Sequence, residues 1–261
     1  MRLGNITCAV ATLAVVVAFG IGGPALADSF FKQVVHTDAF EVMGQTTPET
    51  NDTTTMWLTE GKACSIMGDT AAVIFYPERG EICFVNHQEK QYSLMPMDLG
   101  EIVDQALEEE DEEARQMAEV MKGMAGAIMG SAEITVTPTE ETKKIGDWDC
   151  RKYNVELSMA MVTSEQELWA TEDIKVDYTV FRAVSGGTMA QMPGYDKILE
   201  GMKQIKGVPV KTVATASLMG SDAVTTTELI EYAEKDAPSG IYDIPEGYKK
   251  VEIGMGMGDP D

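Results

Sequence analysis

Apolar and polar residues alternate along most of the chain with the period of two that is typical of β-strands. The alternation is clearest over residues 152–157, 174–180 and 208–216. Further strands are predicted at 34–43, 56–59, 62–67, 71–76, 81–87, 90–95, 133–137, 165–171 and 224–233. Short turn sequences separate these segments, so the pattern indicates about a dozen strands of the antiparallel type.

Two stretches break this alternation and show apolar residues at helical spacing instead. The first runs over residues 98–129, where Asp98 and Glu101 form a start that resembles a capping box. The second begins near Pro193 and ends before Gly207, and its apolar stripe comprises Tyr195, Ile198, Leu199, Met202 and Ile205. Both segments are expected to be amphipathic helices that bury one face.

These elements together predict a mainly β fold with some α-helix, of the α+β class. A curved antiparallel half-barrel of about a dozen strands, covered by two amphipathic helices, is the simplest way to bury both helical stripes. Residues 28–253 are expected to form this single half-barrel domain, and the glycine-rich residues 254–261 a disordered tail.

The first 27 residues have the pattern of a secretory signal peptide. Arg2 is the only charged residue before Asp28, an apolar run covers 9–21, and Ala25-Leu26-Ala27 forms a small-x-small cleavage signature. The run is shorter than the roughly 20 apolar residues that a membrane-spanning helix needs. We therefore expect cleavage near Ala27, a periplasmic or secreted location, and no integral membrane segment in the mature chain.

The chain is strongly acidic, with 43 Asp and Glu against 20 Lys and Arg and a net charge of -23. A surface of that sign repels the phosphate backbone, so nucleic-acid binding is disfavoured. The acidic run 108–113 lacks the oxygen-ligand spacing and the turn glycine of a calcium loop, which favours a solvated helical face.

Three cysteines, Cys64, Cys83 and Cys150, follow the expected signal peptide. If 62–67, 71–76 and 81–87 form a meander, Cys64 and Cys83 flank a third strand about 9–10 Å apart, too far for a disulfide. A bond from Cys150 to either of the others and three buried thiols remain as alternatives.

The motifs that usually carry catalysis or cofactor binding are missing from the sequence. It contains no Gly-x-Ser-x-Gly elbow, His-Glu-x-x-His pair, P-loop or dinucleotide-binding glycine loop. His36 and His87 are its only histidines, and both lie on predicted strands without a nucleophile in a recognisable turn. We therefore expect neither enzymatic activity nor a cofactor, and no metal ligands are assigned.

Methionine is unusually frequent, with 18 in the chain. Thioethers can hold copper(I), but these methionines are scattered, so flexible apolar packing is the favoured interpretation. In the first predicted helix Met117, Met121, Met124 and Ile128 form one adaptable stripe, which could cover a cavity the size of an acyl chain. With Trp169 and Tyr178, chosen from strand alternation, they are the candidate ligand-binding residues.

Several short motifs resemble an exported bacterial family of unknown function. They are Met56-Trp57-Leu58, Gly61-Lys62-Ala63, residues 72–76 and 90–93, then 144–153, 167–174 and 207–211. The resemblance spans roughly residues 30–253. The family is grouped with the periplasmic lipoprotein carriers of the LolA/LolB-like fold, which implies an open antiparallel half-barrel closed by helices over an apolar cavity.

The favoured hypothesis is a periplasmic, non-enzymatic binding module for a lipid or another apolar small molecule. One alternative is the binding of copper(I) or another soft metal through methionines. The other is a structural or sensory role, in which the acidic face binds a basic protein of an envelope complex.

Overall fold

The computed structural model describes residues 28–42, 44–59, 61–97, 123, 131–159, 162–176, 195–218 and 221–251. The predicted signal peptide 1–27 and tail 254–261 lie outside these residues, as does the predicted helix 98–129 apart from Gly123. Within the described part, no helix has both the length and the apolar character needed to span a membrane.

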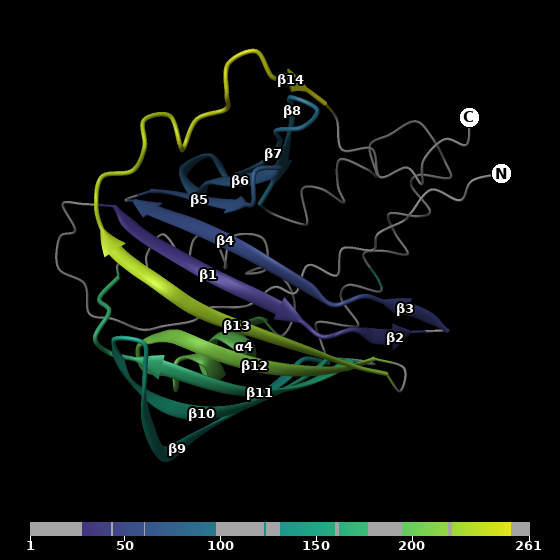
Figure 1. The fold of residues 1–261 in the computed structure, drawn as a ribbon, viewed down its shortest axis with the longest axis vertical. Helices are drawn as coiled ribbons and strands as arrows, with labels where there is room; N and C mark the ends of the chain where they lie inside the picture. Colours follow the sequence, from purple (N-terminus) through teal and green to yellow (C-terminus); the bar gives the residue numbers. More distant parts are fainter. Residues whose placement is uncertain are drawn as a thin grey trace.

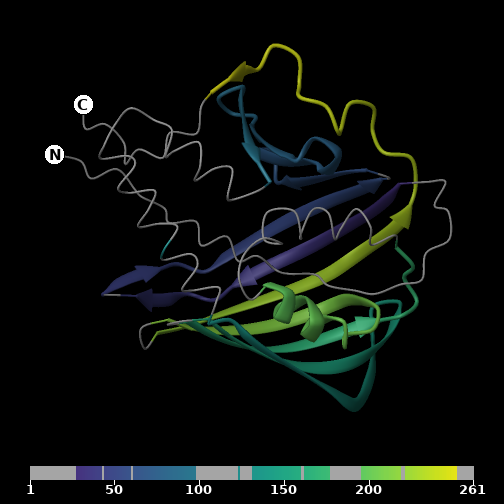
Figure 2. The same cartoon turned by 180° about the vertical axis from the view of Figure 1, so that it is seen from behind.

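Twelve strands form one large open sheet that curves strongly (Figures 1 and 2). In sheet order they are β14 (Lys249–Lys250), β8 (Gln91–Pro96), β7 (Glu81–Asn86), β6 (Ala71–Tyr76), β5 (Lys62–Met67), β4 (Thr50–Thr59), β1 (Ser29–Thr37), β13 (Ser221–Glu234), β12 (Val208–Leu218), β11 (Val162–Thr171), β10 (Trp148–Met159) and β9 (Glu133–Ile145). All neighbouring pairs are antiparallel except β14 with β8, which is parallel. The hairpins therefore follow the order of the sequence, and β1 joins the two halves of the sheet.

Most predicted strands are present, and two of the predicted segments differ. The segment 34–43 is interrupted at Asp38, whose backbone N–H bonds to the carbonyl of Val224 instead of continuing the ladder with β4. After that break β2 (Phe40–Val42) pairs with β3 (Gln45–Thr47) in a separate two-stranded sheet. In 174–180 the described residues 174–176 bury Ile174 and Val176 but belong to no strand.

The predicted fold class is wrong, because the described residues are nearly all β and do not contain two amphipathic helices that cover a half-barrel. The α-helix α4 (Tyr195–Met202) has only eight residues, and η1 (Pro77–Arg79) is a single 3₁₀ turn. The helical stripe predicted from Pro193 onwards does bury Ile205, but two tight i to i+3 bonds follow α4, and Gly207 then takes a φ of +89°. A helix this short covers only β9–β11.

Gly207 is required at the end of this segment by its surroundings as well as by its φ. A Cβ built there would lie 2.0 Å from the carbonyl oxygen of Thr171. Only glycine permits this approach of two backbone segments, and the approach brings the chain from α4 into β12.

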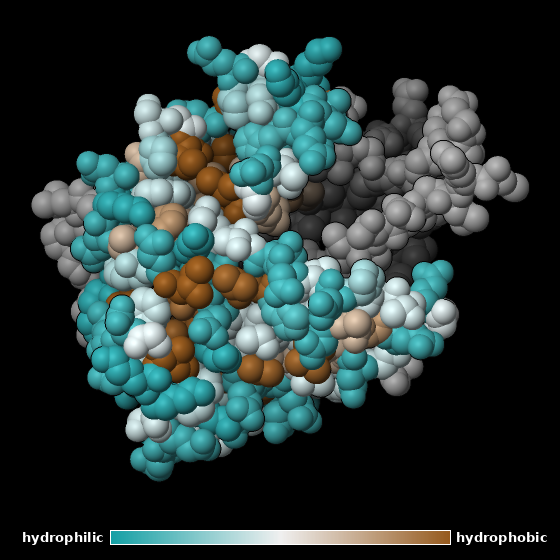
Figure 3. Space-filling view, in the orientation of Figure 1, coloured by the Kyte–Doolittle hydropathy of each residue, from teal (hydrophilic) through white to brown (hydrophobic). Residues whose placement is uncertain are grey.

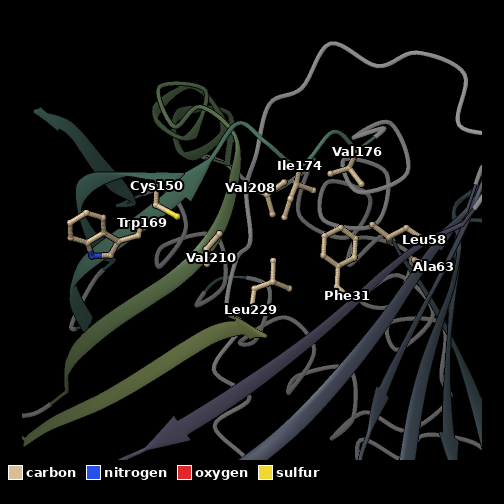
Figure 4. Packing of buried hydrophobic residues seen from close by; sticks show 10 residues of the cluster. All are labelled: Phe31, Leu58, Ala63, Cys150, Trp169, Ile174, Val176, Val208, Val210 and Leu229. Atoms are coloured by element: carbon tan, nitrogen blue, oxygen red, sulfur yellow. The ribbon is translucent and has the colours of Figure 1, made fainter. Parts of the chain in front are cut away.

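Three clusters of buried side chains make up the core. The first joins the two halves of the sheet and comprises Phe31, Leu58, Ala63, Cys150, Trp169, Ile174, Val176, Val208, Val210 and Leu229. Figure 4 shows Ile174 and Val176, from the segment after β11, between Val208 on one side and Phe31 and Leu58 on the other. The second cluster packs α4 on β9–β11, and the third lies over β5–β8.

The third cluster is covered by residues 235–251, which we call the C-terminal strap. Ile241, Tyr242, Ile244 and Tyr248 of the strap pack on it. The Tyr76 hydroxyl donates to the carbonyl oxygen of Tyr242 at 2.9 Å, and Tyr248 Oη lies 2.9 Å from His87 Nδ1. The strap ends as β14, so it connects the middle of the sheet to the β8 edge.

Candidate ligand-binding face

The short helix α4 lies within the curve of the sheet and so marks its concave face (Figure 2). Leu168 on β11 packs in one cluster with Met202 of α4. Leu168 pairs with Thr212 on β12, Thr212 with Thr227 on β13, and Thr227 with Val35 on β1. Directly paired residues lie on the same face of a sheet, so this register carries the concave face from β11 to β1.

The same rule extends the concave face over the other half of the sheet. On β1 the side chain of Phe31 lies on the same face as that of Val35, and Phe31 pairs with Met56 on β4. Two residues along β4, Leu58 pairs with Ala63 on β5, and the register continues from there through β6 and β7 to β8. The C-terminal strap covers the opposite face of β5–β8, so this described segment does not lie on the concave face of these strands.

This concave face carries almost no charge. On β1, β4–β8, β12 and β13 its residues are Ser29, Phe31, Gln33, Val35, Thr37, Thr50, Asp52, Thr54, Met56, Leu58, Ala63, Ser65, Met67, Ala71, Val73, Phe75, Ile82, Phe84, Asn86, Gln91, Ser93, Met95, Val210, Thr212, Ala214, Ala216, Ser221, Ala223, Thr225, Thr227, Leu229, Tyr232 and Glu234. Asp52 and Glu234, both exposed, are the two charged residues among them. In a chain with 43 acidic residues, such a face is suited to an uncharged ligand.

The opposite, outer face differs in character. Figure 3 looks onto it and shows a largely hydrophilic surface in which hydrophobic residues form small separate groups. Ion pairs lie among its side chains, such as Lys211 with Glu228 at 2.8 Å and Lys152 with Glu167 at 3.1 Å. The two faces of the sheet are thus chemically distinct, and solvent suits the outer one.

On the concave face of β5–β7, large apolar side chains remain open to solvent. Phe84 is 37% exposed and Met67 is 44% exposed. Between them lies the half-buried Val73, which pairs directly with Phe84. We call these three residues the apolar strip. The other large hydrophobic residue with comparable exposure among the described residues, Ile230 at 48%, lies in a bulge of β13.

Most of the residues predicted to bind a ligand cannot be placed on this face. Met117, Met121, Met124, Ile128 and Tyr178 lie outside the described residues. They therefore stay predictions.

Trp169 is described, and its side chain is buried in the first cluster with Val208 and Val210. Its assignment to a ligand stays a prediction. Its ring is 7% exposed, with Lys143 Nζ 3.9 Å and Lys152 Nζ 5.9 Å from the ring centroid. These contacts are cation–π interactions, so the indole is already covered by protein.

The apolar strip was missed in the sequence, although a signal for it exists. Residues 71–76 and 82–85 are apolar on both alternating faces, which is typical of strands covered on both sides. The C-terminal strap covers one of those faces. The other face is the concave one, where Val73 and Phe84 lie.

The three described cysteines are free and buried, which confirms the alternative of three buried thiols. Cys64 and Cys83 both pair with Ile74 of the strand between them, which is the arrangement from which a disulfide between them was excluded. Burial raises the pKa of each of the three thiols, including that of Cys150, to about 11. At neutral pH they are protonated and poor nucleophiles.

The two histidines lie in separate polar settings. The ring of His36 bonds to Asn51 Oδ1 and to Asp38 Oδ1, both at 2.8 Å, and these bonds raise its pKa. His87 bonds to Tyr248 of the strap. Within the described part of the chain, no group of three His, Cys, Asp or Glu side chains is arranged to hold a metal ion.

The fold and this face define a protein built on one curved antiparallel sheet with an uncharged inner surface. Residues 122–248 match the model of a family described as Domain of unknown function (DUF4412). That segment includes β9–β13, α4 and most of the C-terminal strap, and the match supports an uncharacterised family. Among curated proteins the chain has no match. This match does not confirm the resemblance to the periplasmic lipoprotein carriers.

Proposed function

We propose that this chain is a non-enzymatic binding module for a lipid or another apolar small molecule. The observation that carries the proposal is the concave face, which is nearly free of charge and leaves Phe84 and Met67 open to solvent. Exposed aromatic and aliphatic side chains gathered on a recessed face favour the removal of apolar surface from water on binding.

The energetics of such a contact are sufficient for affinity. Each buried methylene contributes about 0.8 kcal/mol, so burying ten methylenes contributes ~8 kcal/mol before the costs of association are subtracted. An acyl chain lying along the apolar strip would also bury the exposed parts of Phe84 and Met67. These gains offset the lost motional freedom of a small ligand without any charged contact.

The proposed location is periplasmic or extracellular, and it rests on the leader-like pattern of residues 1–27. A carrier for apolar molecules has a clear use in such a compartment, because these molecules are insoluble in the water between membranes. Fractionation of cells that produce the full chain, with a Gly-Arg interruption of the 9–21 apolar run as control, tests the location.

A fluorescence titration with N-phenyl-1-naphthylamine, a neutral apolar probe, tests binding itself. Replacing Phe84 by Ser removes an exposed ring from the strip, and this should weaken probe binding about 2–5-fold, equivalent to ~0.5–1 kcal/mol. The matched control is Ile230→Ser, because Ile230 is 48% exposed but lies in the bulge of β13. That variant should bind the probe as the wild type does.

Two results would contradict the proposal. One is the absence of saturable probe binding to the wild-type chain. The other is an equal loss of affinity in both variants, which would show that the probe adheres to any exposed apolar residue. Native mass spectrometry of protein isolated from cells, searched for adducts of lipid mass, gives an independent measurement.

A further inference from the structure

A group of uncharged polar side chains lies next to the apolar strip on the concave face. It consists of Gln33, Thr54, Thr212, Thr225 and Thr227, and we call it the polar band. Its members come from four neighbouring strands, β4, β1, β13 and β12. The band therefore crosses the middle of the sheet, where the two halves join.

Two members of the band are largely buried side chains that make no hydrogen bond within the described part of the chain. Gln33 is 8% exposed and Thr227 is 7% exposed. Within the described part of the chain, neither side chain makes a hydrogen bond, whereas Thr225 Oγ1 shares one of 3.2 Å with Thr37 Oγ1. Among the described residues, neither side chain has a polar atom that is both fully buried and without a partner, so the polar atoms of both keep some contact with solvent. They are therefore free to form a hydrogen bond with a bound molecule.

The band can be reached from the concave side, because several neighbours of these two residues are only half-buried. Thr54 pairs with Gln33, and both Val35 and Thr212 pair with Thr227. All three of these neighbours are partly exposed. A molecule on the concave face can thus approach the Gln33 amide and the Thr227 hydroxyl.

The polar band and the apolar strip are continuous along one row of the sheet. Gln33 on β1 pairs with Thr54 on β4, and Thr54 pairs with Met67 on β5. Neighbouring strands lie about 4.8 Å apart, so the polar end of this row is about 10 Å from Met67. A single small molecule with a polar and an apolar part spans that distance.

We propose that the polar band binds the neutral hydrogen-bonding group of an amphipathic ligand, an ester, amide or hydroxyl, whose apolar part lies on the apolar strip. The inference rests on the proposed function and specifies its ligand class. The amide of Gln33 can donate and accept, and the hydroxyl of Thr227 can do either. A carboxylate or phosphate would find no cationic side chain on the concave face of β1, β4, β12 or β13, so its charge would be desolvated without compensation.

Competition between defined probes tests this assignment on the full chain. N-phenyl-1-naphthylamine is bound first and then displaced by 1-monooleoylglycerol, which is neutral, or by oleate at pH 8, which is anionic. Wild-type protein should bind 1-monooleoylglycerol at least tenfold more tightly than oleate.

Variants then locate the polar contact. Gln33→Leu and Thr227→Val each remove polar atoms at nearly constant volume, and each should weaken 1-monooleoylglycerol binding about 3–10-fold while leaving the naphthylamine affinity unchanged. The matched control is Thr226→Val, because Thr226 neighbours Thr227 on β13 but pairs with His36 and Val213 on the opposite face. Thermal melting followed by circular dichroism checks that each variant is folded. If Gln33→Leu does not fold, the result for Thr227→Val decides the question.

The outcomes separate this inference from the proposed function. The inference is overturned if the naphthylamine binds but oleate and 1-monooleoylglycerol bind with equal affinity. It is also overturned if neither variant changes the affinity for 1-monooleoylglycerol, because water then satisfies the polar band. The proposed function then still stands. If the naphthylamine itself does not bind the wild-type chain, both fail.

Discussion

The hydroxyl of Tyr242 offers a sharp test of how the C-terminal strap is held. Among the described residues, Tyr242 Oη is the buried side-chain polar atom that has no hydrogen-bond partner. The backbone carbonyl of the same residue accepts a hydrogen bond of 2.9 Å from the Tyr76 hydroxyl. One strap residue thus contains a polar group without a hydrogen-bond partner and another with one. The first group can be removed by substituting Tyr242, and the second can be deprived of its donor by substituting Tyr76.

Replacing Tyr242 by Phe removes the unsatisfied hydroxyl and keeps the ring against the third cluster. An unpaired buried hydroxyl costs about 1–3 kcal/mol, so the variant should be more stable by roughly 1 kcal/mol, which corresponds to a rise of roughly 2–4 °C in Tm. Tyr76→Phe deletes a donor instead and leaves the carbonyl of Tyr242 without its partner. That variant should lose about 1–2 kcal/mol.

The pH dependence of stability supplies a second readout for the same variant. Burial raises the pKa of the Tyr242 phenol above its ordinary value of about 10. The unfolded chain therefore ionises first as pH rises, and the stability present below pH 10 is lost above it. Tyr242→Phe should lose less stability than the wild type between pH 9 and pH 11.

Urea unfolding followed by far-ultraviolet circular dichroism measures both effects, at pH 7 and across the alkaline range. The reasoning is refuted if Tyr242→Phe destabilises the chain at pH 7 as much as Tyr76→Phe does. That result would mean that the Tyr242 hydroxyl has a partner in solution.

Two further predictions concern the core. Gly207→Ala should lower the free energy of unfolding by ~2–4 kcal/mol, because its Cβ would lie 2.0 Å from the carbonyl oxygen of Thr171. The control is Gly240→Ala, at a similar φ of +80° with no atom within 4 Å, which should lower it by only about 1 kcal/mol. Equal losses of stability in the two variants, measured by urea unfolding, would contradict the clash. The buried thiols of Cys64, Cys83 and Cys150 should react with a maleimide at pH 7.5 only after unfolding, and rapid labelling of the native chain would show that they are exposed. Because burial raises their pKa values to about 11, they favour the folded state below pH 9, and this contribution to stability should be lost as pH rises from 9 to 11.

The strands could be predicted from the sequence because each has a strong local signal. Residues 62–67 and 71–76 are short, mainly apolar segments bounded by turn sequences, and the structure forms β5 and β6 with those bounds. The excluded disulfide between Cys64 and Cys83 followed from the same local order of strands. Hairpins joined in sequence need no long-range information.

The prediction was wrong where the outcome depended on packing between distant segments. The stripe that includes Ile198 and Ile205 is real, since the second cluster contains Ile205 and contacts Ile198. Its periodicity does not show that the chain leaves the helix after Met202 in two tight turns. Likewise, alternation in 174–176 buries Ile174 and Val176, but strand formation also needs a neighbouring edge with which to pair.

The candidate site was hidden from the sequence for the same reason. Period-two alternation identifies two faces of each strand but does not say which of them is concave. That assignment needed the contact of α4 with β11 and the strand register that leads from there through Thr212 and Thr227 to β1. Trp169 was assigned to the ligand on alternation alone; the structure buries it in the first cluster, and the assignment stays a prediction.

The limits of the family match have a practical consequence, because they cut through the sheet. Residues 122–248 include β13 but not its partner β1, and they include the strap residues Ile241 and Tyr242 but not the strands β5–β8 on which these pack. Expressed alone, that segment would present a fourteen-residue strand with an open backbone edge and a loose apolar tail. Unpaired edges of this kind recruit other copies of themselves. We therefore expect the fragment to self-associate, and we expect the addition of residues 28–97 to prevent this self-association by pairing with the open edge.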